Sequence, residues 1–156
     1  MTKNQEVEIK IEKVEGTNDL PIPVSASKYS SGVDLFSAEE HEISLKPNEI
    51  KLVSTGIKID IPKGYEGQVR PRSGLAVKHG ITVLNSPGTI DSDYRGIVKI
   101  ILINLGDKEF SIQRGDRIAQ LVIQKIYFPC FKIVQSLNTT KRGEGGFGHS
   151  GIKKLD

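Results

Sequence analysis

The feature that most constrains the fold is a series of short apolar segments, rich in Ile and Val, separated by turn-forming residues along most of the chain. Short apolar runs bounded by Gly, Pro, Asn and Asp are typical of strands, and almost nothing here has the helical period. An all-β sandwich or barrel is therefore expected. The expected strands include Val7 to Ile11, Ile43 to Leu45, Ile50 to Val53, Ile57 to Ile61, Val69, Ile81 to Leu84, Ile97 to Leu105, Phe110 to Ile112, Ile118 to Ile123 and Phe131 to Val134.

Residues 73–79 are expected to form one short helix. Ser73 can act as the N-cap, and Gly80 stands where a glycine ends a helix. The chain has 156 residues, the size of one domain. Its composition changes only after Asn138, where a glycine-rich segment has no apolar period. We therefore expect one all-β domain over residues 1–138 and a flexible tail over residues 139–156.

Several classes of protein are disfavoured. With Cys130 as its one cysteine, the chain can form no internal disulfide or thiolate metal cage, and its three histidines are too scattered to suggest zinc. No apolar run approaches a membrane span, so a cytoplasmic protein without a membrane partner is expected. The net charge of +3 comes from Lys and Arg interspersed with acids, so no nucleic-acid partner is expected.

The loop between the runs ending at Leu84 and beginning at Ile97 is the first candidate site. Residues 85–96 contain two acids, Tyr94 and Arg95. In one interpretation, Ser-Pro-Gly is ordinary turn chemistry and the acids are solvated. In the other, the extra length serves binding, since a tight hairpin needs only about two to five connecting residues.

Arg72, Ser73 and Gly74 suit a phosphate group. A helix start offers free N–H donors, Arg can bind two oxygens, and Gly lets an anion approach the backbone. The alternative is that Ser73 merely caps the helix and Arg72 lies on the surface. In the tail, Arg142 stands among glycines, and Phe147 suits stacking on a flat ligand, unless this segment is simply a disordered terminus.

Two further segments each carry a polar residue within an apolar run. Gln120 interrupts a strand, where it either belongs to a polar face or points its amide into a cleft. Asp34 lies between Val33 and Leu35, where a buried carboxylate needs hydrogen-bond donors or a hydrated cation, although a turn residue is the commoner case.

Taken in order, five segments closely resemble the five motifs of the homotrimeric deoxyuridine triphosphate nucleotidohydrolases, the dUTPases. They are Ser31 to Leu35, Pro71 to Leu75, Leu84 to Gly96, Arg114 to Gln120 and Arg142 to Gly151. One such segment means little, but five in order across most of the chain make coincidence an inadequate explanation.

The resemblance implies a jelly-roll-like subunit in a homotrimer with shared active sites. The implied substrate is dUTP, which water converts to dUMP and pyrophosphate by attack on the α-phosphate. This keeps uracil out of DNA and supplies dUMP for thymidylate synthesis. The triphosphate implies Mg²⁺, which Asp34 would contact through water.

The resemblance also assigns roles to residues. Asp91 looks like the general base for the attacking water. Gln120 looks like a donor near the α-phosphate, and Arg72, Ser73 and Gly74 look like the phosphate cradle. The tail would close over the substrate, with Phe147 on uracil. The remaining tail residues assigned to the phosphates are Arg142, Gly148, His149 and Ser150.

The base and sugar would be read by the hairpin. A strand edge that offers a backbone N–H and C=O matches uracil, whereas cytosine leaves buried polar atoms unpaired at a cost of about ten-thousand-fold. Tyr94 under the sugar would exclude a 2′-hydroxyl by steric contact. The residues assigned to the base are Asn85, Gly88, Thr89 and Ile90.

The sequence departs from the family pattern at Ile97, often Glu, and at His149-Ser150, usually Ser-Thr. His149 would make phosphate contact pH-sensitive near neutrality. The related deoxycytidine triphosphate deaminases require a glutamate on the strand after the hairpin, and residues 97–105 contain no acid. A nucleic-acid-binding module would need interleaved aromatics, which form only 6% of the chain.

Overall fold

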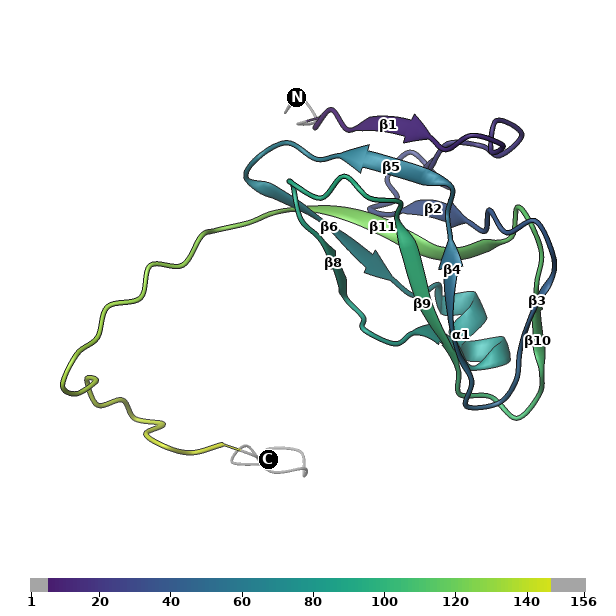
Figure 1. Ribbon diagram of the computed structural model, residues 1–156. Coiled ribbons are helices and arrows are strands. Elements are labelled where there is room, and N and C mark those ends of the chain that lie inside the picture. Colours follow the sequence, from purple (N-terminus) through teal and green to yellow (C-terminus); the bar gives the residue numbers. More distant parts are fainter. Residues whose placement is uncertain (1–5, 147–156) are drawn as a thin grey trace.

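The computed structural model describes residues 6–146, which form eleven short strands and one helix (Figure 1). The prediction of an all-β fold with one short helix is confirmed. No helix in this part of the chain has the length and apolar character needed to span a membrane. The elements are β1 (Lys10–Lys13), β2 (Val33–Phe36), β3 (Ile43–Leu45), β4 (Ile50–Ser54), β5 (Ile57–Asp60), β6 (Tyr65–Arg70), α1 (Ser73–His79), β7 (Ile81–Val83), β8 (Gly88–Ile90), β9 (Lys99–Asn104), β10 (Phe110–Ile112) and β11 (Arg117–Lys125).

The strands form a jelly roll in which every pairing is antiparallel. A four-stranded sheet has the order β2-β11-β6-β8 and a three-stranded sheet the order β4-β9-β7, while β1 pairs with β5 and β10 with β3. Both larger sheets contribute alternate Ile, Leu and Val side chains to one core. Its most deeply buried members include Leu35, Leu45, Val53, Ile81, Ile100, Leu102 and Ile112.

Two strands of the four-stranded sheet, β6 and β2, could not be predicted in full from the sequence. In β6 the inward positions are Tyr65, Gly67 and Val69, and the alternation is weak because Gly67 has no side chain. A Cβ there would lie 3.0 Å from side-chain atoms of Ile61 and Leu121, so the core requires glycine. In β2, Asp34 interrupts the apolar residues.

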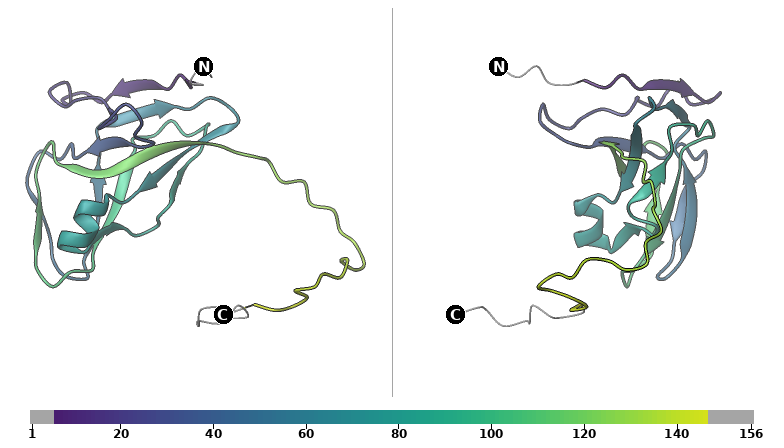
Figure 2. Two further views of the ribbon diagram at one scale, coloured as in Figure 1. Left: turned by 180° about the vertical axis from the view of Figure 1, so that it is seen from behind. Right: turned by 90° about the vertical axis from the view of Figure 1, so that its left-hand side faces the viewer.

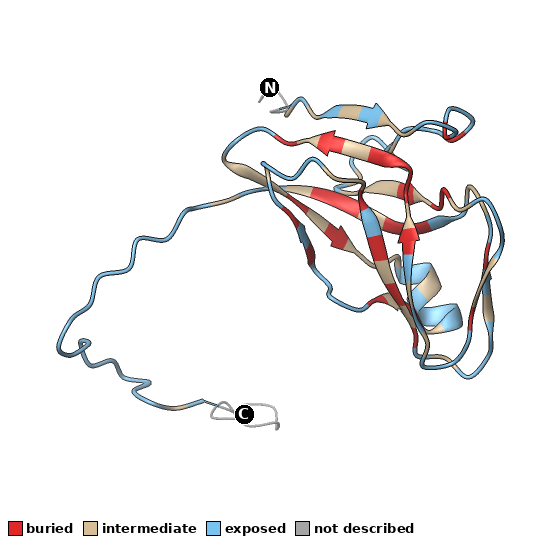
Figure 3. Cartoon of the chain, in the orientation of Figure 1, coloured by how far each residue is buried: buried red, intermediate tan, exposed pale blue. Residues whose placement is uncertain are grey.

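The expectation that residues 131–134 form a strand is wrong. After β11 the chain leaves the body as an extended segment, residues 126–146, here called the arm (Figures 1 and 2). Its side chains are almost all exposed, and the buried residues belong to the body (Figure 3). Phe131 and Ile133 are exposed and belong to no strand among the described residues. Their apolar character was therefore misleading as a sign of a strand.

The helix is where the sequence places it, but its start differs from the expectation. Arg72 is the residue preceding the helix, with extended backbone, and no side chain caps the first turn. Ser73 is therefore the first helical residue, because β6 continues in extended form through Pro71 and Arg72 and delays the start of the helix. Gly80 ends the helix in the left-handed conformation, as predicted.

The long hairpin is confirmed and has an additional strand within it. β7 pairs with β9, so the predicted flanking strands are neighbours. Between them the chain crosses to the other sheet, where β8 pairs with β6 and forms the edge of the four-stranded sheet. The loop is long because it connects two sheets.

Candidate functional site

The predicted site residues fall into two groups within one chain. The first, here called the arginine cluster, consists of Asp34, Pro71, Arg72, Arg117 and Gln120. β2, β11 and the segment after β6 bring these residues together, since Gln120 lies opposite both Asp34 and Arg70 in the sheet.

Asp34 is the centre of the arginine cluster. Its side chain is 14% exposed and forms ion pairs with Arg72, whose Nε lies 3.0 Å from Oδ1, and with Arg117, whose Nη1 lies 3.2 Å from Oδ2. Arg72 also donates from Nη1 to the Arg117 carbonyl at 3.0 Å. The sequence predicted either hydrogen-bond donors or a hydrated cation beside this carboxylate. In the structure, the two arginines are the donors.

Gln120 is held beside these arginines. Its Nε2 donates to the Pro71 carbonyl at 2.9 Å. A Cβ at Gly32 would overlap the Gln120 amide oxygen, so glycine at position 32 makes room for this side chain. Ser73 and Gly74 follow on the first turn of α1, where both are exposed.

The second group surrounds a cavity of about 320 Å³ beside β8, here called the hairpin cavity. Predicted residues Thr89, Ile90, Asp91 and Tyr94 line it. Gly88 is buried, and a Cβ on it would lie 3.1 Å from the Asn85 amide nitrogen, so Asn85 and the start of β8 are in close proximity. The other lining residues are Leu52, Ile97, Val98 and Lys99.

Asp91 and Tyr94 lie on one turn, closed by a hydrogen bond from the Tyr94 N–H to the Asp91 carbonyl at 3.1 Å. The Asp91 carboxylate is exposed, and within residues 6–146 no side chain or backbone group hydrogen-bonds to it. It is therefore available to accept a proton. The Tyr94 hydroxyl donates to the Ile97 carbonyl at 3.1 Å, which fixes the ring at the cavity.

The two groups lie toward opposite ends of β6. Ile90 pairs with Gly67 of β6, so Asp91 continues toward Glu66 while Arg72 lies beyond the opposite end of that strand. From Glu66 to Arg72 the chain advances by about 20 Å at the usual rise of a strand.

Of the predicted tail residues, Arg142 lies in the described part of the chain, and no hydrogen bond or ion pair within that part joins it to either group. Arg142 belongs to the arm, which extends away from the body (Figures 1 and 2), and its Nε donates to the Gly145 carbonyl at 2.7 Å. Phe147, Gly148, His149 and Ser150 lie outside the described residues.

Sequence reasoning missed Arg117 in the arginine cluster and four residues that line the hairpin cavity, Leu52, Ile97, Val98 and Lys99. Arg117 belongs to the segment that was singled out for Gln120, but its contact with Asp34 depends on the pairing of β11 with β2. Leu52 and Lys99 join the hairpin cavity through the pairing of β4 with β9, for which the local sequence contains no signal.

No group of three His, Cys, Asp or Glu side chains suited to a metal ion occurs in residues 6–146. The two Asp34 oxygens already accept from arginines. The implied Mg²⁺ therefore fits these residues only as an ion that arrives on the triphosphate, which needs no complete set of protein ligands.

Comparisons of the sequence and of the structure with known proteins match this chain to one family. The sequence profile of the dUTPase family matches residues 18–151. A deoxyuridine 5'-triphosphate nucleotidohydrolase of a Thermoanaerobacter species is 53% identical over 144 residues, covering 92% of this chain and 97% of the relative. The enzyme of that name from Ehrlichia canis is 51% identical over 154 residues, covering 97% and 100%.

Solved structures agree in fold. A Staphylococcus bacteriophage 80alpha dUTPase with dUPNHPP superposes with a TM-score of 0.83 at 28% identity, covering 93% of this chain and 99% of that one. A mutant dUTPase from phage phi11 of S. aureus, described as coordinating a structural Mg(II) ion, gives 0.74 at 26% identity, covering 83% and 97%.

Proposed function

The chain belongs to the dUTPase family and hydrolyses dUTP to dUMP and pyrophosphate, and we propose which of its residues bind each part of dUTP and which one activates the attacking water. The observation that carries the proposal is the exposed carboxylate of Asp91, which has no hydrogen-bond or ion-pair partner within residues 6–146, at a cavity lined by an edge strand and a tyrosine.

Uracil binds along β8. An edge strand leaves backbone N–H and C=O groups without a strand partner on its outer side, and these match uracil N3–H and O4. Gly88 lets the base approach the backbone, Asn85 borders the pocket, and Thr89 and Ile90 form its wall. Cytosine presents the reverse polarity and leaves both backbone groups unpaired, which costs more than a missing contact.

Tyr94 lies under the deoxyribose. Its hydroxyl is occupied by the Ile97 carbonyl, so the ring presents an apolar surface rather than a hydrogen-bonding partner to the sugar. A 2′-hydroxyl would meet this surface without a partner and without space. The sugar is therefore selected by exclusion.

Asp91 acts as the general base. It takes a proton from the water that attacks the α-phosphorus, while the bond to the β-phosphate oxygen breaks and pyrophosphate leaves on the opposite side. The task requires an ionised carboxylate within hydrogen-bond reach of that water. An exposed carboxylate that has no ion pair among the described residues suits this role.

The arginine cluster holds the phosphates. Asp34 fixes the Arg72 guanidinium, Gln120 donates toward the α-phosphate, and Ser73 and Gly74 present the N–H groups of the first turn of α1. When bound, Mg²⁺ neutralises charge on the phosphate oxygens. Each carboxylate oxygen can accept more than one hydrogen bond, so Asp34 can also accept from a water on that ion while both arginines stay bound.

The tail completes the site over the bound nucleotide. Arg142, Gly148, His149 and Ser150 contact the phosphates, and Phe147 covers uracil. In this division of the chain, residues 1–138 form the catalytic domain and residues 139–156 form the lid.

The complete site requires several copies of the chain, arranged as a homotrimer. Along β6, Asp91 is separated by about 13 Å from the level of Gln120 and by about 20 Å from Arg72, farther than one water molecule and one phosphate can bridge. Two cross-strand pairs, Ile50 with Ile103 and Leu52 with Ile101, form an apolar face on β4 and β9. Leu52 also lines the hairpin cavity, so a copy docked on this face would reach the site.

The arm supports the same arrangement. Six of its large apolar side chains are at least half exposed, an excess that indicates burial against another chain. They are Tyr127, Phe128, Phe131, Ile133, Val134 and Leu137.

The test is to supply the protein with Mg²⁺ and dUTP, dCTP, dTTP or UTP in turn and to follow pyrophosphate. We expect turnover of dUTP far above the other three, and a loss of about 100-fold or more in kcat for Asp91→Asn with dUTP binding retained. Asp93→Asn is the matched control, since Asp93 is exposed in the same loop but does not line the hairpin cavity. Wild-type turnover by Asp91→Asn would refute the assigned base, and equal turnover of UTP would refute the role of Tyr94.

A further inference from the structure

Arg95 follows Tyr94, yet its guanidinium lies outside the hairpin cavity and holds the loop from its other side. Nη1 donates to the Ser92 carbonyl at 2.8 Å and to the Tyr94 carbonyl at 2.9 Å. Both carbonyls belong to the short segment that begins at Asp91. One planar group thus closes the loop that carries both Asp91 and Tyr94.

The same guanidinium connects this loop to the body of the protein. Its Nη2 donates to Asp60 Oδ1 at 2.6 Å, and Asp60 is the last residue of β5. The neighbours of Asp60 in sequence, Ile59 and Ile61, are almost completely buried, so the backbone at this position is fixed by the core. Asp60 is therefore a rigid anchor for an otherwise exposed loop.

We propose that Arg95 and Asp60 are a positioning pair for the reaction: they set the placement of Asp91 and Tyr94 without touching the substrate. This inference rests on the proposed roles of those two residues. An exposed ion pair contributes little to overall stability, and Arg95 and Asp60 are 56% and 40% exposed. Three directed hydrogen bonds from one guanidinium instead restrict geometry, to which catalysis is far more sensitive than folding is.

The chain offers a matched control on the same strand. Lys58 and Glu12 form an ion pair between β5 and β1 with an N–O distance of 2.7 Å; both line a cavity beside Arg95, but neither has a hydrogen bond or ion pair to residues 91–96. Lys58→Met removes a pair of similar exposure and leaves the loop anchored.

The experiment compares Arg95→Met, Asp60→Ala, their double variant, Lys58→Met and Asp91→Asn by kcat, KM for dUTP and melting temperature. We expect Arg95→Met to lower kcat by about 10- to 100-fold with KM changed by less than about threefold, because the base and phosphates are held by other elements. Asp60→Ala should lower kcat by a smaller factor. The double variant should match Arg95→Met within about twofold, because Asp60 is bonded to the loop through Arg95.

Wild-type kcat in Arg95→Met, multiplicative losses in the double variant, or an equal loss in Lys58→Met would each overturn the inference. If Asp91→Asn is inactive while Arg95→Met is fully active, the positioning pair is wrong and the proposed function stands. If Asp91→Asn is active, the proposed function itself fails.

Discussion

Tyr94 depends on the glycine two residues after it. A Cβ built on Gly96 would lie 2.5 Å from Cζ of the Tyr94 ring, so the ring packs directly against the backbone at this position. The glycine is needed for space, since its backbone is outside the left-handed region. The position of the Tyr94 ring at the hairpin cavity therefore requires a residue without a Cβ at position 96.

Gly96→Ala should weaken selection of the sugar. The added methyl group displaces the Tyr94 ring, which opens room for a 2′-hydroxyl, and the preference in kcat/KM for dUTP over UTP should fall by about tenfold or more. Steady-state kinetics with both nucleotides measure this ratio. An unchanged ratio in a variant that folds normally would show that Tyr94 does not test the sugar.

For individual residues, the sequence predicted which side chains belong to the site better than it predicted which side chains contact one another. Asp34, Arg72 and Gln120 were all chosen, and the structure brings them together. Arg117 was not, because its contact with Asp34 depends on an irregularity in strand pairing between Arg117 and Ala119. Such a shift changes where a side chain points, and no local pattern reveals it.

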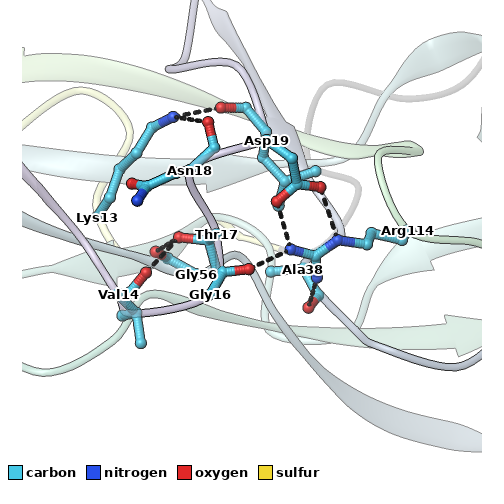
Figure 4. Close-up of polar contacts among 10 residues, drawn as sticks. Lys13, Val14, Gly16, Thr17, Asn18, Asp19, Ala38, Gly56 and Arg114 are labelled. Carbon is cyan, nitrogen blue, oxygen red and sulfur yellow. Dashed lines mark hydrogen bonds and ion pairs between the residues drawn. The ribbon is translucent and has the colours of Figure 1, made fainter.

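Among the elements, the turn before β11 is tied to the N-terminal part of the chain by Arg114 (Figure 4). Its Nε and Nη2 bind both Asp19 oxygens at 2.9 and 2.8 Å, Nη2 also reaches the Gly16 carbonyl, and Nη1 reaches the Ala38 carbonyl. The hydrogen bond from Arg114 holds the pKa of the Asp19 carboxyl below its ordinary value. Three separate segments thus meet at one guanidinium.

This contact predicts a pH-dependent stability. Because the folded pKa of Asp19 is lowered, its contribution is present above the ordinary Asp pKa of about 3.9 and disappears as the pH falls through the lower, folded value. Asp19→Asn should therefore melt below wild type at pH 7, and the difference should shrink below about pH 4. Thermal melts across this range measure it.

Asp107→Asn serves as the control, since Asp107 has no ion pair within the described residues and should show no such convergence. A gap between wild type and Asp19→Asn that stays constant down to pH 2 would contradict the assignment.

The sequence predicted β7 and β9 from their runs of Ile, Val and Leu, and it predicted the end of α1 from Gly80. β6 was reduced to Val69 because Gly67 interrupts its inward face. The strand expected over residues 131–134 failed for a different reason: β-branched and aromatic residues indicate burial against something, and the sequence does not say whether that partner is the same chain.

For the whole molecule, the apolar face on β4 and β9 predicts how the chain assembles. Leu52→Glu places a charge at the centre of this face, where an interface would have to bury it. Leu52 is 56% exposed, so the isolated fold should tolerate the change. We expect sedimentation to show a trimer for wild type and a monomer for Leu52→Glu, with unchanged circular dichroism.

Ile22→Glu is the matched control, because Ile22 is 51% exposed but lies outside this face. A trimer that persists in Leu52→Glu would show that the chains associate through another surface. Only the family resemblance, and no pattern in the sequence, predicted three copies, because a shared interface adds no periodicity to a strand.

The most direct test of a site shared between chains is complementation. Asp91→Asn lacks the proposed base and Arg72→Ala lacks a proposed phosphate ligand, so each variant alone should be inactive. When the two variants are co-expressed in equal amounts, random trimers should recover about a quarter of wild-type dUTP hydrolysis, because each site draws an intact Asp91 and an intact Arg72 independently from different chains. Absence of any recovered activity in verified mixed trimers would contradict the account, because it would place Asp91 and Arg72 of each site on the same chain.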